Sequence, residues 1–265
     1  MTNLDIKNIA KDTIEQETKA INNLLNYVDD DFCEVVNKIF SSKGRVIITG
    51  IGKSANIAEK IVSTLNSTGT ASLFMHAAEA IHGDLGMVQK YDIVICVSKS
   101  GNTPEIKVLI PLIKANHNLL IALVGDKESF LAKSADYVLR CDVDKEADPN
   151  NLAPTCSTTA QLVMGDALAV CLLNKRGFTA KDFAKYHPGG SLGKRLYLKV
   201  SDLYINNEKP QISPLTPLNE ALIEITSKRL GCSAVIENDK IVGIITDGDL
   251  RRMLSKQNSS ITLDI

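Results

Sequence analysis

Short apolar runs alternate with longer amphipathic stretches through most of the chain. The apolar runs have the length and branched composition of buried strands, and they lie at residues 45–49, 71–74, 93–97, 119–124 and 137–139. Between them, stretches such as 55–65 and 105–114 repeat apolar residues at helical spacing. This alternation predicts an α/β fold in which five parallel strands form a doubly wound sheet with helices on both faces.

Helical patterns also precede and follow the predicted strands. Residues 4–40 have helical spacing with a break at Asp29-Asp30-Asp31, which predicts two leading helices. Residues 158–174 predict a long, strongly apolar helix. Such a helix packs either on the sheet or against a partner subunit, and the pattern alone leaves both open.

The character of the chain changes near residue 200, where a Pro-rich stretch at 209–217 predicts a linker. We predict a first domain over residues 1–200 and a second over 205–265. The second domain contains a predicted helix at 218–226, a hairpin formed by 233–237 and 240–246, and a helix at 249–256. A unit of about sixty residues buries little surface, so we expect it to pair with another copy.

Composition and charge disfavour several classes of partner. The 265 residues are 44% hydrophobic and carry a net charge of −1 without a block of Lys or Arg, which disfavours binding to nucleic acid or an anionic membrane. The N-terminus lacks the apolar run of a signal peptide, and no later stretch approaches the ~20 apolar residues of a membrane span. We therefore expect a cytoplasmic protein. The six cysteines have no metal-ligand spacing, which predicts reduced thiols.

Three polar clusters, at residues 50–54, 98–103 and 187–190, lie beside predicted strand or helix ends. In a parallel sheet the ligand binds outside the carboxyl ends of the strands, where helix N-termini attract anions. Within 98–103, the hydroxyls of Ser98 and Ser100, the small Gly101 and the N-cap Thr103 can converge on one phosphate. The alternative is an ordinary Ser/Gly turn that caps its helix. The hydroxyl-rich segment 155–159 either closes on the same ligand or caps the long helix.

The cluster at 50–54 resembles the start of a dinucleotide fingerprint, but two features argue against one. The third glycine is replaced by Asn56, and no acidic residue ends the second predicted strand to bind a ribose. The sequence therefore disfavours a nicotinamide cofactor. Backbone donors, several hydroxyls and one Lys suit a small phosphorylated metabolite better than a long polymer.

Several residues in these loops could move protons. A carboxylate or imidazole beside a carbonyl sugar can move a proton between adjacent carbons while a cation stabilises the enediolate. The candidates are Glu79, His82, Glu105, Glu146 and His187, together with Lys53. Any single Glu could equally be a solvated surface charge. His76 and His82 form a weak zinc pattern, so we expect no required metal.

Taken together, the motifs resemble a known family. Residues 50–54, 76–86, 98–103, 152–159 and 187–190 resemble the sugar isomerase (SIS) domain of the D-arabinose-5-phosphate isomerase family, over roughly residues 40–200. Residues 243–252 resemble the first of the two CBS motifs that follow in this family, so we expect a partial CBS domain.

The resemblance implies that the protein interconverts D-ribulose 5-phosphate and D-arabinose 5-phosphate. This reaction supplies 3-deoxy-D-manno-octulosonate (Kdo) for lipopolysaccharide or capsule and needs no redox cofactor. The family precedent also implies a homotetramer whose sites share residues between subunits. An alternative is a non-catalytic SIS-domain sensor of sugar phosphates. Such regulators carry a helix-turn-helix domain first, and the forty leading residues here are too few for that domain plus the leading SIS helices.

The resemblance also implies roles for individual residues. The catalytic positions are Lys53, Glu105, Glu146 and His187, with Glu146 as the leading base and His187 assisting ring opening. His76 matches a position that binds an inhibitory zinc. The family's phosphate loop matches at Ser98, Ser100 and Gly101, whereas Lys99, Asn102 and Thr103 fall at variable positions. The predicted substrate-binding residues are Ser54, Gly69, Thr70, His82, Ser98, Ser100, Gly101, Thr103 and Ser157.

Overall fold

The computed structural model describes residues 1–190, 194 and 199–256. The chain divides into two compact units, residues 1–193 and 194–265. Residues 191–193 and 195–198 of the predicted first domain, and residues 257–265 of the predicted second domain, lie outside the described residues. The exact domain boundaries stay a prediction, and each unit is described by itself.

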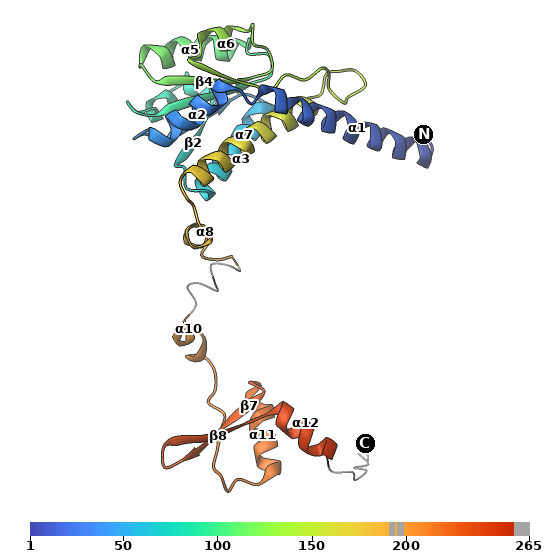
Figure 1. The fold of residues 1–265 in the computed structure, drawn as a ribbon, viewed down its shortest axis with the longest axis vertical. Helices are drawn as coiled ribbons and strands as arrows, with labels where there is room; N and C mark the ends of the chain where they lie inside the picture. Colours follow the sequence, from blue (N-terminus) through green and yellow to red (C-terminus); the bar gives the residue numbers. More distant parts are fainter. Residues whose placement is uncertain (191–193, 195–198, 257–265) are drawn as a thin grey trace. The chain divides into compact units, whose positions relative to one another are not determined.

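The first unit is built on a five-stranded parallel sheet with the order β2-β1-β3-β4-β5. This arrangement confirms the predicted fold class (Figure 1). The strands are β1 (Val46–Gly50), β2 (Ser72–His76), β3 (Ile93–Ser98), β4 (Leu119–Val124) and β5 (Tyr137–Arg140). The strand order reverses between β1 and β3, which is where doubly wound sheets bind their ligands.

Helices cover both faces of the sheet because successive strand residues point to opposite sides. Val46 and Ile48 pack into one buried cluster and Ile47 into the other. On the first face lie η1 (Leu24–Tyr27), α2 (Asp30–Ser41), α3 (Lys53–Ser67) and α7 (Cys156–Lys175). Helix α1 (Asn3–Asn23) packs on α7. On the second lie α4 (Ala77–Ala80), α5 (Pro104–Ala115) and α6 (Phe130–Ser134), with η2 (Asp84–Met87) following α4.

Helix α7 corrects one expectation from the sequence. Its 20 residues are apolar enough, by length and composition alone, to cross a membrane, although no such stretch was expected. In the fold α7 packs against α3, α1 and α2, and half of its most apolar window is buried. This packing accounts for its composition, because a core helix is apolar on more than one side.

The second unit contains a three-stranded sheet with the order β6-β7-β8. The predicted hairpin is present, and Asn238 and Asp239 turn it with φ values of 50° and 60°. Part of the Pro-rich stretch is not a plain linker, because Gln211 and Ile212 pair with β7 as a short parallel strand. The elements are α10 (Val200–Tyr204), β6 (Gln211–Ile212), α11 (Leu218–Lys228), β7 (Cys232–Glu237), β8 (Lys240–Thr246) and α12 (Asp247–Lys256).

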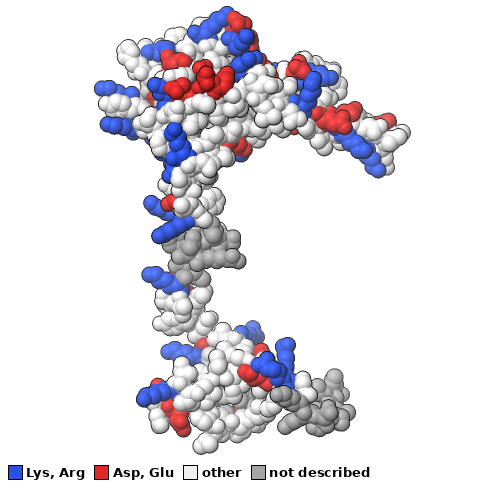
Figure 2. Space-filling model, in the orientation of Figure 1, with Lys and Arg blue, Asp and Glu red and all other residues white. Residues whose placement is uncertain are grey.

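The surface of each unit mixes both signs of charge. On the face shown in Figure 2, Lys and Arg side chains are interspersed with Asp and Glu rather than gathered into one basic area. This distribution agrees with the net charge of −1.

Candidate active site

A cavity of about 220 Å³ opens beside the carboxyl ends of β1 and β3. Three segments meet there: the start of α3, the loop between β3 and α5, and the start of α7. The lining residues are Ile51, Lys53, Ser54, Val97, Ser98, Lys99, Ser100, Thr103, Pro154, Ser157 and Thr158. The fold thus brings Lys53 together with five of the predicted substrate-binding hydroxyls, as expected at the switch point of the sheet.

The phosphate loop, residues 98–103, is held in a tight turn by its own side chains. The Ser98 hydroxyl oxygen accepts a hydrogen bond from the Gly101 N–H at 3.0 Å, and the Ser100 hydroxyl oxygen accepts one from the Asn102 N–H at 3.3 Å. Both hydroxyls act as acceptors in these bonds, so each keeps its own proton to donate to a ligand. Gly101 has φ +62°, and a Cβ there would lie 2.3 Å from the Ser129 oxygen. Only glycine fits this position.

Thr103 is the N-cap residue of α5, as predicted, but its hydroxyl makes no capping bond. Within the described part of the chain, this buried oxygen has no hydrogen-bond partner. Buried polar atoms are seldom left unpaired, and Thr103 lines the cavity. An unpaired hydroxyl in this position is suited to binding an anion.

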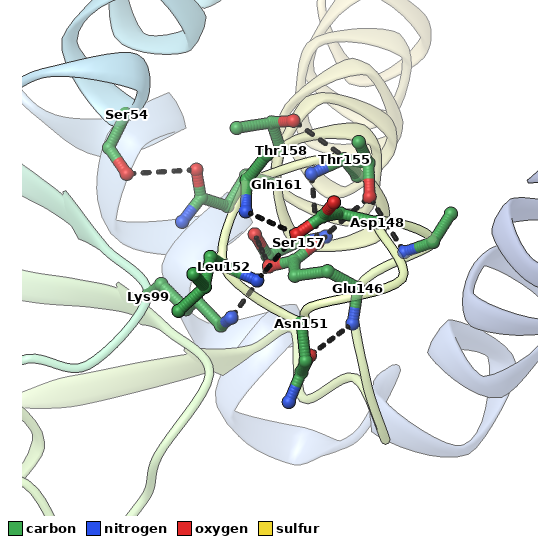
Figure 3. Close-up of polar contacts among 12 residues, drawn as sticks. Ser54, Lys99, Glu146, Asp148, Asn151, Leu152, Thr155, Ser157, Thr158 and Gln161 are labelled. Carbon is green, nitrogen blue, oxygen red and sulfur yellow. Dashed lines mark hydrogen bonds and ion pairs between the residues drawn. The ribbon is translucent and has the colours of Figure 1, made fainter.

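The start of α3 supplies a cation and a hydroxyl. Gly52 precedes the helix with φ +59°, which turns the chain so that Lys53 and Ser54 form the first helical turn. The Ser54 hydroxyl donates to Gln161 Oε1 at 3.2 Å, which links α3 to α7 (Figure 3). Sequence reasoning missed Gln161, although its place one helical turn after Ser157 on α7 was a usable signal.

Glu146 lies between β5 and α7, and its side chain is buried, with only 1% exposed. Its Oε1 accepts from the Ser157 hydroxyl at 2.5 Å and lies 2.6 Å from Lys99 Nζ. Its Oε2 accepts from the N–H groups of Thr155 and Ser157 at 2.8 and 3.1 Å, and from the Thr155 hydroxyl at 3.2 Å. The carboxylate therefore caps the N-terminus of α7, where the helix dipole favours negative charge (Figure 3).

Two opposing effects set the pKa of Glu146. Burial raises this pKa, because it removes water from the ionised form. The bonds from Lys99, Ser157 and Thr155 outweigh burial and lower the pKa to about 2. The carboxylate is therefore ionised at neutral pH and is a weak base as long as these contacts last.

The other predicted catalytic and metal-binding positions lie away from this cavity lining. Glu105 is half-buried in the first turn of α5, and His82 is exposed after α4. His76 ends β2, and its Nδ1 atom is buried without a partner in the described part of the chain. Among the described residues, no group of three or more His, Cys, Asp or Glu could hold a metal ion. The described part of one chain therefore does not supply a complete zinc site.

Gly69 and Thr70 precede β2, so they lie at the amino ends of the strands, whereas the phosphate loop lies at the carboxyl ends. The Thr70 hydroxyl accepts from Arg176 Nε at 3.2 Å. A Cβ on Gly69 would lie 2.8 Å from the Phe178 ring. Within one chain, these two predicted substrate-binding residues pack against the segment that follows α7.

His187 follows α8 (Ala180–Tyr186) and does not line the cavity either. Its ring stacks on Phe183 with the ring centres 3.9 Å apart. Its Nδ1 lies 2.9 Å from the Phe183 carbonyl oxygen, which can only accept. The neutral ring therefore carries its proton on Nδ1, and Nε2 is left to accept a proton from a ligand.

Comparison with known proteins agrees with this fold. Residues 38–171 match the SIS domain family and residues 200–256 match the CBS domain family. The fold and these two matches thus define a SIS-domain protein that carries a CBS segment.

The relatives define the family more closely. Arabinose 5-phosphate isomerase KdsD of Pseudomonas aeruginosa is 50% identical over 96% of this chain and 78% of the relative. KdsD of Escherichia coli K12 is 47% identical over 94% of this chain and 76% of the relative. A solved E. coli CFT073 protein in complex with arabinose 5-phosphate has a TM-score of 0.69 at 42% identity, covering 71% of this chain and all of that one. The chain belongs to the arabinose 5-phosphate isomerase family.

Proposed function

We propose that this protein is an aldose–ketose isomerase that interconverts D-ribulose 5-phosphate and D-arabinose 5-phosphate. The observation that carries the proposal is the 50% identity with an arabinose 5-phosphate isomerase over 96% of the chain. The cavity supports it, because hydroxyls, helix N-termini and a lysine surround a space suited to a small phosphorylated sugar.

The reaction moves one proton between adjacent carbons and needs no net oxidant or reductant. A base removes a proton from C1 of the ketose, the enediolate forms, and a proton is returned to C2 while a hydroxyl proton passes from O1 to O2. In our proposal Ser54, Ser98, Ser100 and Thr103 bind the phosphate, Lys53 stabilises the enediolate and Glu146 is the base. In the reverse direction His187 assists opening of the aldose ring through Nε2.

The decisive experiment incubates the purified full chain with D-ribulose 5-phosphate and follows formation of the aldose product. We expect D-arabinose 5-phosphate to accumulate until equilibrium. Tight binding of the ketose without any aldose product would instead identify the non-catalytic sensor.

A Glu146→Gln variant should lower kcat by about 10²–10⁴-fold with a small change in KM. Near-normal turnover would move the base to Glu105 or Glu79.

We also propose that the enzyme is a homotetramer with sites shared between subunits. This proposal is supported by the placement of His187, Gly69 and Thr70, which lie away from the cavity within one chain. Light scattering over a dilution series, with activity measured in parallel, tests it. A fully active monomer would exclude shared sites.

We place the reaction in the cytoplasm, as a supply step for Kdo synthesis, because a phosphate dianion does not cross a bilayer unaided. We propose that no metal or redox cofactor takes part, and that zinc inhibits through His76. In this proposal zinc bound at His76 takes its remaining ligands from a neighbouring subunit or from the substrate. His76→Ala should then relieve inhibition by added zinc while leaving metal-free turnover measurable.

A further inference from the structure

The ion pair between Lys99 and Glu146 joins the phosphate loop to the proposed base. Lys99 belongs to the loop and lines the cavity, whereas Glu146 is absent from the lining and is 1% exposed. Ser157, whose hydroxyl donates to Glu146, lines the cavity from α7. Lys99 and Ser157 thus both contact the carboxylate of Glu146 (Figure 3) and both line the cavity in which we place the substrate.

This arrangement is poorly suited to proton transfer. Both oxygens of Glu146 are occupied by strong donors, and Lys99 adds a full positive charge 2.6 Å from Oε1. A carboxylate held in this way has little affinity for a further proton. For Glu146 to act as a base, Lys99 must leave it.

Lys99 can move without disturbing the core. Its side chain is 45% exposed, and the flexible four-carbon stem allows the ammonium to turn about the loop. Its backbone lies between Ser98 and Ser100, which we place on the substrate phosphate. A phosphate dianion in the loop would carry up to two negative charges against the single charge of Glu146, so it competes strongly for the ammonium.

We propose that Lys99 is a positioning residue: it pairs with Glu146 in the free enzyme and transfers to the substrate phosphate, so that Glu146 becomes a competent base only when substrate is bound. This inference deepens the proposed isomerase function and rests on it. Thr155 and Ser157 continue to hold the carboxylate in place after Lys99 has left. Burial continues to raise the pKa of Glu146, whereas the lowering effect of Lys99 is gone. The pKa therefore rises towards the working range of a base.

The remaining charged groups around Glu146 do not belong to the phosphate loop. Asp12 of α1, Lys145 and Asp148 line a second cavity together with Glu146 itself. The carboxylate of Asp148 is engaged by the N–H groups of Leu152 and Ala153. Phosphate binding therefore acts on Glu146 through Lys99.

The test compares the pH profiles of kcat and kcat/KM for the full-length wild type, Lys99→Met and Lys99→Arg, with D-ribulose 5-phosphate as substrate. The profile of kcat/KM reports the free enzyme, and that of kcat reports the enzyme–substrate complex. In Lys99→Met the fall of kcat/KM on the acidic side of its profile should shift to a pH higher by about one unit or more. The corresponding fall of kcat should stay at the wild-type pH, because in the complex Lys99 has already left Glu146. Lys99→Arg should retain the wild-type profiles, and Lys127→Met, at an exposed lysine in the loop after β4, is the matched control.

Two outcomes would overturn the proposal. An equal fall in activity at every pH would mean that Lys99 only supports the fold. A higher KM with both falls at the wild-type pH would mean that it only binds phosphate. Hydrogen exchange read on peptides of the first unit identifies misfolded variants.

A second measurement on the wild type needs neither a variant at Lys99 nor isomerase activity. The carboxyl carbon of Glu146, labelled with carbon-13 and assigned with Glu146→Gln, is titrated at several pH values with and without inorganic phosphate. Phosphate should raise its titration midpoint, and an unmoved midpoint would refute the transfer of Lys99. Failure of the wild type to convert the ketose would overturn the proposed function separately.

Discussion

Replacing Glu146 by glutamine should destabilise the first unit by an amount that depends on pH. Glutamine has nearly the shape of the protonated acid and, like that acid, lacks the negative charge of the carboxylate. The pKa of the carboxyl is about 2 in the fold against 4.5 for the free side chain. This gap of about 2.5 units is worth about 3 kcal/mol.

The sign follows from the lowered pKa. A group whose pKa is lower in the folded state contributes its full stabilisation above its unfolded pKa and loses it as the pH falls towards the folded value. The stability gap between wild type and Glu146→Gln should therefore be about 3 kcal/mol at pH 7 and at pH 5. It should shrink to about 1.5 kcal/mol at pH 3 and approach zero near pH 2.

The assay must report on the first unit alone, because a melting curve of a chain with two compact units mixes their transitions. Hydrogen exchange read on peptides from β3 and α7 gives the opening free energy of this unit. Glu128→Gln is the control: Glu128 forms an exposed ion pair with Lys133 at 3.2 Å, and its loss should cost under about 1 kcal/mol. A gap for Glu146→Gln that is equal at pH 7, 5 and 3 would refute the electrostatic reasoning.

Two further predictions concern packing and domain roles. In Gly165→Ala the new Cβ would lie 2.4 Å from the buried Ile61 side chain between α7 and α3. Overpacking should cost about 1–3 kcal/mol and outweigh the helix-propensity gain of about 1 kcal/mol, so the variant should be less stable. The double variant with Ile61→Val should recover part of this loss in the same exchange assay, and no recovery would contradict the packing argument. Deleting the residues after 203 should leave measurable isomerase activity, and complete loss in a folded, correctly assembled truncation would show that the tail contributes to the active site.

Most of the fold could be predicted from the sequence because it rests on local patterns. The five strands lie within about two residues of their expected bounds, since a buried parallel strand is a short apolar run closed by polar or glycine residues. The hairpin at Asn238 and Asp239 was equally local, because few residue types tolerate positive φ. The convergence of the phosphate loop and the start of α3 followed from a general property of parallel sheets, whose strand ends share one edge.

Tertiary structure decided what depends on contacts between distant segments. The sequence left open whether α7 packs inside the chain or against a partner, and in the fold it is a core helix. The sequence predicted the Pro-rich stretch as a linker, and in the fold part of it is strand β6. The bond from Ser54 to Gln161 joins residues 107 positions apart, and no periodicity marks such a pair.

The site shows the same division between sequence and structure. The sequence by itself named Glu146 as a candidate base and residues 98–103 as a candidate anion site, because residue type and motif carry that information. It treated Lys99 as a variable loop position. Only the fold brings Lys99 to 2.6 Å from a buried carboxylate and so sets the protonation state of Glu146. Charge state depends on burial and on neighbours in space, and these exist only once the chain has folded.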